Sequence, residues 1–247
     1  MKFALVNGEK SEATKGAKGI CRSCGSELIA KCGEINVHHW AHKGNRNCDS
    51  WWETETEWHR SWKNKFPVEW QEVVHHADNG EKHIADVETP TGWVLEFQHS
   101  YLKPEERRSR DAFYSKLIWV VDGARRKTDI PKFNEALKEG LVIAPHPPFQ
   151  IVMIHFPDEC RIIRDWRNST APVLFDFQQV NGAEHPMLWL LFPMISDSVA
   201  YICSFPRNLF IDSHNKNEFD LVFNKTILPF RNELIALDNR RKQRHYL

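Results

Sequence analysis

Three polar side chains interrupt sequence segments that otherwise have the pattern of buried strands. Asp86 lies in HIADVE, and Glu96 and Gln98 lie in WVLEFQHS. Residues two apart in a strand project from the same face, so Glu96 and Gln98 share a face. A hairpin turn near Pro90 and Thr91 would place Asp86 roughly opposite Glu96. Two carboxylates and an amide would then converge, which is a ligand set suited to Mg²⁺ or Mn²⁺. Such an ion lowers the pKa of bound water and neutralises charge on a phosphate.

A preceding helix offers further groups for the same chemistry. In WWETETEWHRSWKNKF, Glu55, His59 and Lys63 recur at intervals of four residues, as on one helix face. Glu55 could extend the metal shell, and His59 could relay a proton because imidazole titrates near neutrality. Gln98 cannot supply positive charge, so Lys63 or Lys82 is the candidate for that role. The alternative is that the two strand carboxylates only form ion pairs at a sheet edge. Polar groups in buried strands nevertheless require a reason.

A second cluster, of cysteine and histidine, lies near the N-terminus. Its pattern is C-x2-C-x17-H-x5-C. Four protein ligands of this kind form a closed structural zinc site, whereas a catalytic zinc needs an open position. A small polar segment has little core of its own, so the metal could supply folding free energy. The preferred ligands are Cys21, Cys24, His42 and Cys48, with His39 as the alternative to His42 and Cys32 as a weaker spare.

The surrounding pattern predicts a mixed α/β (α+β) protein with three parts. Residues 1–52 would form the zinc-binding module. Residues 53–144 contain elements in the order α-β-β-β-α-β. Residues 145–247 would form a strand-rich module that ends in a polar helix from about Asn232. The elements expected in the middle part are a helix ending before Pro67, the strands VEWQEVVHHA, EKHIADVET and WVLEFQHS, the helix KPEERRSRDAFYSK and the strand LIWVVDG. A helix in RRKTDIPKFNEALKEG is expected to connect this part to the last one.

Composition restricts the classes of partner. The chain has 247 residues, with 33 basic and 33 acidic side chains, so no global charge steers it toward a polyanion. No apolar run is long enough for a membrane span, and the N-terminus lacks the pattern of a signal peptide. We therefore expect a cytoplasmic protein without a membrane partner. Four tryptophans lie in or next to the first helix: Trp51, Trp52, Trp58 and Trp62. They could stack on bases, but packing in the core is favoured for them.

These motifs together carry a family resemblance. D-x9-ExQ within an αβββαβ order resembles the PD-(D/E)xK nuclease superfamily, with Gln in place of the usual Lys. The ordered set CRSCGSELIAKCGE, HHWAHK, ETEWHRSWK, HIADV, EFQHS and RSRDAFY resembles the competence protein CoiA family. The similarity covers about residues 17–123. In HIADV, Ile84 stands where the family tends to have Arg, and no motif could be identified in the last hundred residues.

The resemblance implies a bacterial protein that handles incoming or foreign DNA, with a restriction-endonuclease-like core that cuts phosphodiester bonds using Mg²⁺ or Mn²⁺. Asp86 and Glu96 would be metal ligands, and Gln98 would take the position of the motif Lys. Glu55 would match the acidic residue of the first helix. The same motifs would contribute four further residues, which are His59, Lys63, Arg110 and Tyr114. Of these, we expect Lys63 and Arg110 to contact DNA phosphates.

Two other functions stay open at this stage. A non-catalytic DNA-binding or recombination-accessory module could retain the nuclease fold without its chemistry. A zinc-stabilised scaffold for protein interaction is a third possibility, for which the Trp-rich surface would matter more than phosphate contacts. Paired cuts by the nuclease would suit a homodimer. Substitution of Asp86 or Glu96 separates the first two functions, because only a nuclease would lose cleavage while binding is retained.

Overall fold

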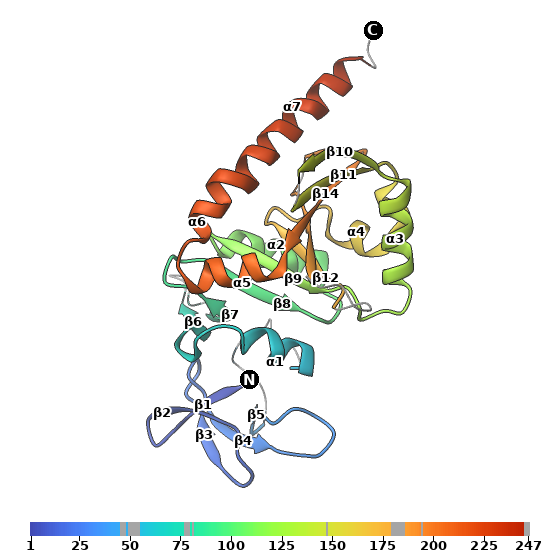
Figure 1. Ribbon diagram of the computed structural model, residues 1–247. Helices are drawn as coiled ribbons and strands as arrows, with labels where there is room; N and C mark the ends of the chain where they lie inside the picture. Colours follow the sequence, from blue (N-terminus) through green and yellow to red (C-terminus); the bar gives the residue numbers. More distant parts are fainter. Residues whose placement is uncertain are drawn as a thin grey trace. The chain divides into compact units, whose positions relative to one another are not determined.

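The computed structural model describes residues 1–44, 48, 55–76, 80, 82–146, 148–178, 186–193 and 195–244. In this structure the chain divides into two compact units. Unit 1 comprises Met1–Glu88 and Val94–Ser100, and unit 2 comprises Thr89–Trp93 and Tyr101–Leu247. The structure is a mixed α+β protein (Figure 1). No helix in the described ranges is long and apolar enough to cross a membrane.

Unit 1 begins with a five-stranded antiparallel sheet in the order β2-β1-β3-β4-β5. Its strands, blue in Figure 1, are β1 (Phe3–Val6), β2 (Glu9–Glu12), β3 (Lys18–Ile20), β4 (Glu27–Lys31) and β5 (His39–His42).

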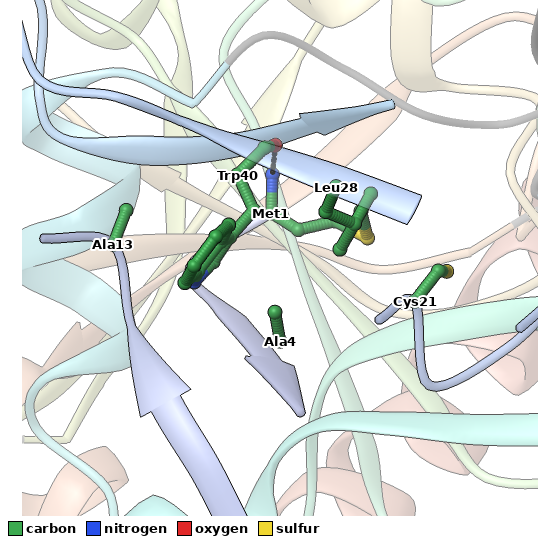
Figure 2. Packing of buried hydrophobic residues seen from close by; sticks show 6 residues of the cluster. All are labelled: Met1, Ala4, Ala13, Cys21, Leu28 and Trp40. Carbon is green, nitrogen blue, oxygen red and sulfur yellow. Dashed lines mark hydrogen bonds between the residues drawn. The ribbon is translucent and has the colours of Figure 1, made fainter. Parts of the chain in front are cut away.

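This first sheet has a small core of its own around Trp40, which is fully buried (Figure 2). Met1, Ala4 and Leu28 pack in the same cluster. Gly19 on β3 allows the strands to approach, because a Cβ there would lie 2.7 Å from the Cβ of Ala4 and 3.2 Å from the Trp40 ring. The core of this segment is therefore small, and a metal at the cysteine and histidine cluster could add folding free energy to it.

The second part of unit 1 contains a helix and three antiparallel strands in the order β8-β7-β6. The helix is shorter than predicted, because Thr56 is its N-cap and its hydroxyl accepts a hydrogen bond from the amide of His59 at 3.2 Å. The elements are α1 (Glu57–Lys63), the 3₁₀ turn η1 (Val68–Trp70), β6 (Gln71–His76), β7 (Lys82–Glu88) and β8 (Val94–Gln98).

Aromatic packing fixes α1 on this second set of strands. Trp62 of α1 is fully buried and stacks on Phe97 of β8, with ring centroids 5.5 Å apart, and Phe66 stacks on the same ring at 6.2 Å. Trp58 is buried as well. The preference for a core role of these two tryptophans is thereby supported, while Trp51 and Trp52 lie outside the described residues.

Unit 2 places six described strands in the order β10-β11-β14-β13-β12-β9. Only the β9–β12 pair among these is parallel. The elements are α2 (Pro104–Phe113), β9 (Leu117–Asp122), α3 (Asp129–Glu139), β10 (Leu141–His146), β11 (Phe149–Ile154), η2 (Pro157–Glu159), α4 (Arg161–Trp166), β12 (Val173–Asp176), β13 (Met187–Leu191), β14 (Ala200–Pro206), α5 (Arg207–Asn215), α6 (Phe219–Val222), the π-helical turn η3 (Phe223–Ile227) and α7 (Leu228–Arg244).

The predicted element order around the acidic motif is confirmed as α1, β6, β7, β8, α2 and β9. The terminal helix begins at Leu228, earlier than predicted, and α4, α5 and α6 were not foreseen. The predicted boundary between residues 144 and 145 falls within β10, and β9 pairs with β12 from the far side of that boundary. The nuclease assignment of the middle part stays a prediction.

Candidate functional site

The cysteine pair lies in the loop that joins β3 to β4. This loop closes on itself, because the amide of Cys21 donates to the carbonyl of Ser26 and the amide of Gly25 donates to the carbonyl of Cys21, both at 2.9 Å. Gly25 has a φ of +73°, a conformation that glycine adopts without steric cost. The loop thereby turns the side chains of Cys21 and Cys24 toward His42 at the end of β5.

The four preferred ligands are brought together in this structure. The ligand atoms of Cys21, Cys24, His42 and Cys48 all lie within 4.8 Å of one another. The sulfurs of Cys21 and Cys48 are 3.5 Å apart, and Nε2 of His42 is 3.3 Å from the sulfur of Cys24. A zinc–sulfur bond of about 2.3 Å gives a tetrahedron with edges of about 3.8 Å, whereas a disulfide would need about 2.05 Å. The group could therefore bind a metal such as zinc.

Neither spare ligand joins this group. Nδ1 of His39 is 2.9 Å from the carbonyl of Val37, and the sulfur of Cys32 lies 3.6 Å from the carbonyl of Ala13. The electrostatics of the group show how its charge state would depend on a bound cation. The adjacent thiol of Cys48, together with burial, raises the pKa of Cys21, so a thiolate there depends on a nearby positive charge.

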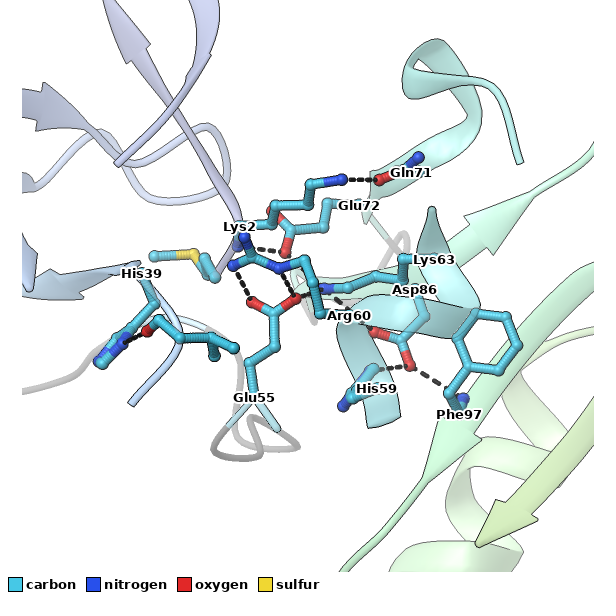
Figure 3. A network of polar contacts seen from close by, with 12 residues as sticks. Lys2, His39, Glu55, His59, Arg60, Lys63, Gln71, Glu72, Asp86 and Phe97 are labelled. Atoms are coloured by element: carbon cyan, nitrogen blue, oxygen red, sulfur yellow. Dashed lines mark hydrogen bonds and ion pairs between the residues drawn. The ribbon is translucent and has the colours of Figure 1, made fainter. Parts of the chain in front are cut away.

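The predicted helix residues lie in a second, buried network of charged side chains (Figure 3). Glu55 comes just before the N-cap, so it is not on the helix face as predicted. Its carboxylate nevertheless turns back to α1. It forms a bidentate pair with Arg60 at 2.7 and 3.0 Å and lies 3.0 Å from Nζ of Lys63. Burial opposes its charge, but Lys63 and Arg60 outweigh it and lower the pKa of Glu55 to about 2.

Lys63 lies at the centre of this network. Its ammonium is 2.9 Å from Glu72, 3.0 Å from Glu55 and 3.9 Å from Asp86, and the side chain is 3% exposed. Burial alone would lower the pKa of this lysine, but the three carboxylates raise it above its usual range. Lys82, the other candidate for a charged partner, instead lies 3.5 Å from the carbonyl of Ser23.

Asp86 links the network to the motif on β8. Its Oδ2 lies 2.8 Å from Nε2 of His59 and accepts a hydrogen bond from the amide of Phe97 at 2.9 Å. Phe97 is the residue between Glu96 and Gln98. Burial would raise the pKa of Asp86, but His59, Lys63 and the Phe97 amide hold it below the usual value.

The described pairing of β7 with β8 ends one residue short of the two carboxylates. Val87 pairs with Leu95 and Glu88 with Val94, so continuing this register places Asp86 opposite Glu96. Glu96 and Gln98 are both buried, at 4% and 3% exposure. The amide nitrogen of Gln98 lies 3.3 Å from the hydroxyl and from the carbonyl oxygen of Ser100.

Glu72 is a member of the network that the sequence did not reveal. It has a φ of +49°, and the β6–β7 register passes from Gln71–Val87 to Val73–Ala85 without pairing it. Its carboxylate accepts hydrogen bonds from the amides of Lys2 and Phe3 at 2.6 and 2.9 Å and from Lys63 at 2.9 Å. No sequence pattern singles out Glu72, because most residues of β6 are polar.

Two residues assigned by resemblance lie in unit 2. Arg110 of α2 forms an ion pair with Glu106 and lies over the ring of Trp119, with its guanidinium carbon 5.7 Å from the centroid. Tyr114 is buried and its ring packs edge-on against Phe113 at 4.9 Å. Their roles at DNA therefore stay predictions.

Comparison with known proteins gives one finding. No curated protein matches the chain, and no solved structure matches it. Residues 6–50 match the family model described as competence protein CoiA, N-terminal domain. That segment contains all four candidate metal ligands, and the match supports a relationship to the CoiA family.

Proposed function

We propose that this protein is a metal-dependent DNA endonuclease with a competence-related role, acting in the cytoplasm on incoming or foreign DNA. The match to the CoiA N-terminal domain supports the competence-related part. The hydrolytic part depends on one contact. The amide of Phe97 donates to Asp86, so the carboxylate of β7 reaches the backbone of the Glu96-Phe97-Gln98 motif.

Asp86 and Glu96 would hold the catalytic Mg²⁺ or Mn²⁺. The donors fit, since both are carboxylates, which such ions prefer. Asp86 is 15% exposed, and its Oδ1 is 3.9 Å from Lys63, too far for a hydrogen bond. The bound ion would supply Lewis acidity and a lowered pKa of water.

The neighbouring residues would position these groups. Lys63 and His59 hold the Asp86 carboxylate from the side of α1. His59 would relay a proton in this proposal, and its second ring nitrogen, Nδ1, is buried without a hydrogen-bond partner among the residues that the structure describes. Glu55 fixes Lys63, and the Gln98 amide would orient water or phosphate. Arg110 would contact phosphate, and a homodimer would allow paired cuts.

The decisive experiment compares Asp86→Asn and Glu96→Gln with Glu88→Gln. Glu88 lies on β7 with Asp86, and its carboxylate contacts His75. Glu88→Gln therefore removes the same charge from the same strand at a different site. Cleavage of plasmid and single-stranded DNA is measured with Mg²⁺ or Mn²⁺, and DNA binding is measured separately at low salt, where phosphate contacts are strongest. We expect the first two variants to lose at least about 100-fold in cleavage with binding retained, and Glu88→Gln to cut normally. Normal cleavage by Asp86→Asn would refute the assigned centre.

The second candidate function is a non-catalytic DNA-binding or recombination-accessory module. It is favoured by the contacts that Asp86 already makes with His59 and the Phe97 amide, because such contacts also suit a purely structural carboxylate. DNA binding by the wild-type protein without cleavage in either metal would identify this function. Failure to bind DNA at low salt would instead favour a zinc-stabilised scaffold for protein interaction.

A further inference from the structure

Arg22 connects the metal-binding loop to the buried charged network. It lies between Cys21 and Cys24 in the β3–β4 loop, and its Nη1 donates to the main-chain carbonyl of Glu72 at 2.8 Å. A metal held by both cysteine sulfurs would fix the backbone on each side of Arg22. The guanidinium would then be held in the position from which it reaches Glu72.

The residue that Arg22 contacts has an unusual backbone conformation. Glu72 is in the left-handed region at a φ of +49°, which a non-glycine residue keeps only where its surroundings impose it. Arg22 holds its carbonyl, while the amides of Lys2 and Phe3 hold its carboxylate. Glu72 is therefore fixed at both ends by the first sheet of unit 1.

From Glu72 the contacts continue to the acidic motif. The carboxylate that accepts from Lys2 also pairs with Lys63, whose ammonium lies 3.9 Å from Asp86. Asp86 in turn accepts from the Phe97 amide. A series of direct contacts thus runs from the metal-binding loop through Arg22, Glu72 and Lys63 to Asp86, all within unit 1.

We propose that metal binding by Cys21, Cys24, His42 and Cys48 sets the position of Asp86 through Arg22 and Glu72, so that Arg22 and Glu72 act as positioning residues. The inference depends on a metal ion at these four ligands and does not depend on DNA cleavage. Coupling of this kind is reciprocal: if bound metal stabilises the Asp86 contact by some factor, the formed contact strengthens metal binding by the same factor.

The test uses the full chain loaded with one equivalent of Zn²⁺, and it compares Arg22→Gln with Lys43→Gln. Lys43 follows His42, and its side chain is 65% exposed and forms an ion pair only with Glu27 among the described residues. Lys43→Gln removes the same positive charge as Arg22→Gln. Hydrogen exchange of the Phe97 amide reports the hydrogen bond to Asp86 directly. Zinc affinity is measured by competition with a chelator.

We expect Arg22→Gln to speed exchange of the Phe97 amide about tenfold and to weaken zinc binding by a similar factor. Lys43→Gln should change neither. The amide of Trp40, which donates to the carbonyl of Met1 at 2.8 Å in the first sheet, serves as an internal reference that should keep its exchange rate. Unchanged Phe97 exchange in Arg22→Gln, or equal acceleration at Trp40, would overturn the proposal, as would failure of the chain to bind zinc. Absence of nuclease activity would leave the expected exchange result unaltered.

Discussion

Replacing Glu55 with Gln tests whether the buried network contributes to the stability of unit 1. The substitution keeps the shape of the side chain and removes its charge. The carboxylate is 3% exposed and pairs with both Arg60 and Lys63. Breaking an isolated buried ion pair costs about 3–5 kcal/mol, and here the cost should lie toward the lower value because Lys63 keeps Glu72 at 2.9 Å and Arg60 keeps Glu12 at 3.4 Å.

The pKa of Glu55 gives a second value for the same quantity. It falls from 4.5 to about 2 in the folded protein. A shift of one unit corresponds to about 1.4 kcal/mol, so the charged carboxylate stabilises the fold by about 3 kcal/mol at pH 7. Because the folded pKa is depressed, this contribution is complete above pH 4.5 and is lost as the pH falls toward 2. At pH 3 it should be about 1.4 kcal/mol.

Urea denaturation followed by tryptophan fluorescence at pH 7, 5, 4 and 3 measures these differences. Glu57→Gln is the matched control, since Glu57 is exposed in the first turn of α1 and should change the free energy of unfolding by less than about 1 kcal/mol. The deficit of Glu55→Gln should shrink as the pH falls. A deficit below about 0.5 kcal/mol at pH 7, or one that stays constant down to pH 3, would refute the reasoning.

Three further predictions concern other parts of the chain. Cys48→Ser should abolish stoichiometric metal binding, measured by elemental analysis, while Cys32→Ser should retain it, because Cys32 lies outside the group of four; equal metal content in both would contradict the ligand set. Gly19→Ala should lower the free energy of unfolding by about 1–3 kcal/mol, because its Cβ would overlap buried side chains, whereas Gly33→Ala has open space and should be neutral in the same urea titration. His214 is fully buried, and burial lowers its pKa from 6.5 to about 3. The unfolded state therefore takes up a proton first, and the free energy of unfolding falls as the pH drops below 6.5. His214→Phe should lose less stability between pH 7 and 4, and an unchanged acid profile would contradict this.

The sequence was informative where one local pattern determines the structure. The αβββαβ order could be predicted because each element has its own periodicity and its own turn residues. The five short strands of the first sheet could not, because most have only three or four residues and their core depends on Trp40, which lies far along the chain from Met1 and Ala4. The extent of α1 was overestimated because Thr56 as N-cap was not recognised.

The candidate site was only partly predictable for a related reason. The candidate metal ligands follow a spacing rule, and three of them lie in or next to short loops and strand ends. Glu55 was assigned by helical spacing, which does not apply because it lies before the N-cap of α1. Its carboxylate nevertheless points toward α1 and contacts Lys63. Glu72 gave no pattern at all, because its role arises from a left-handed backbone and from contacts with Lys2 and Phe3, about seventy residues away.

The three carboxylates of the network differ in how closely positive charge lies to them. Glu55 and Glu72 each lie about 3 Å from Lys63, and Glu55 has Arg60 as well, so their charges are closely compensated. Asp86 is 3.9 Å from the same ammonium and is the most exposed of the three carboxylates. Its remaining charged neighbour is His59, which compensates it only when protonated. Among the three, Asp86 is therefore the carboxylate with most room for a further cation, which is why the proposed Mg²⁺ or Mn²⁺ is assigned to it and Glu96.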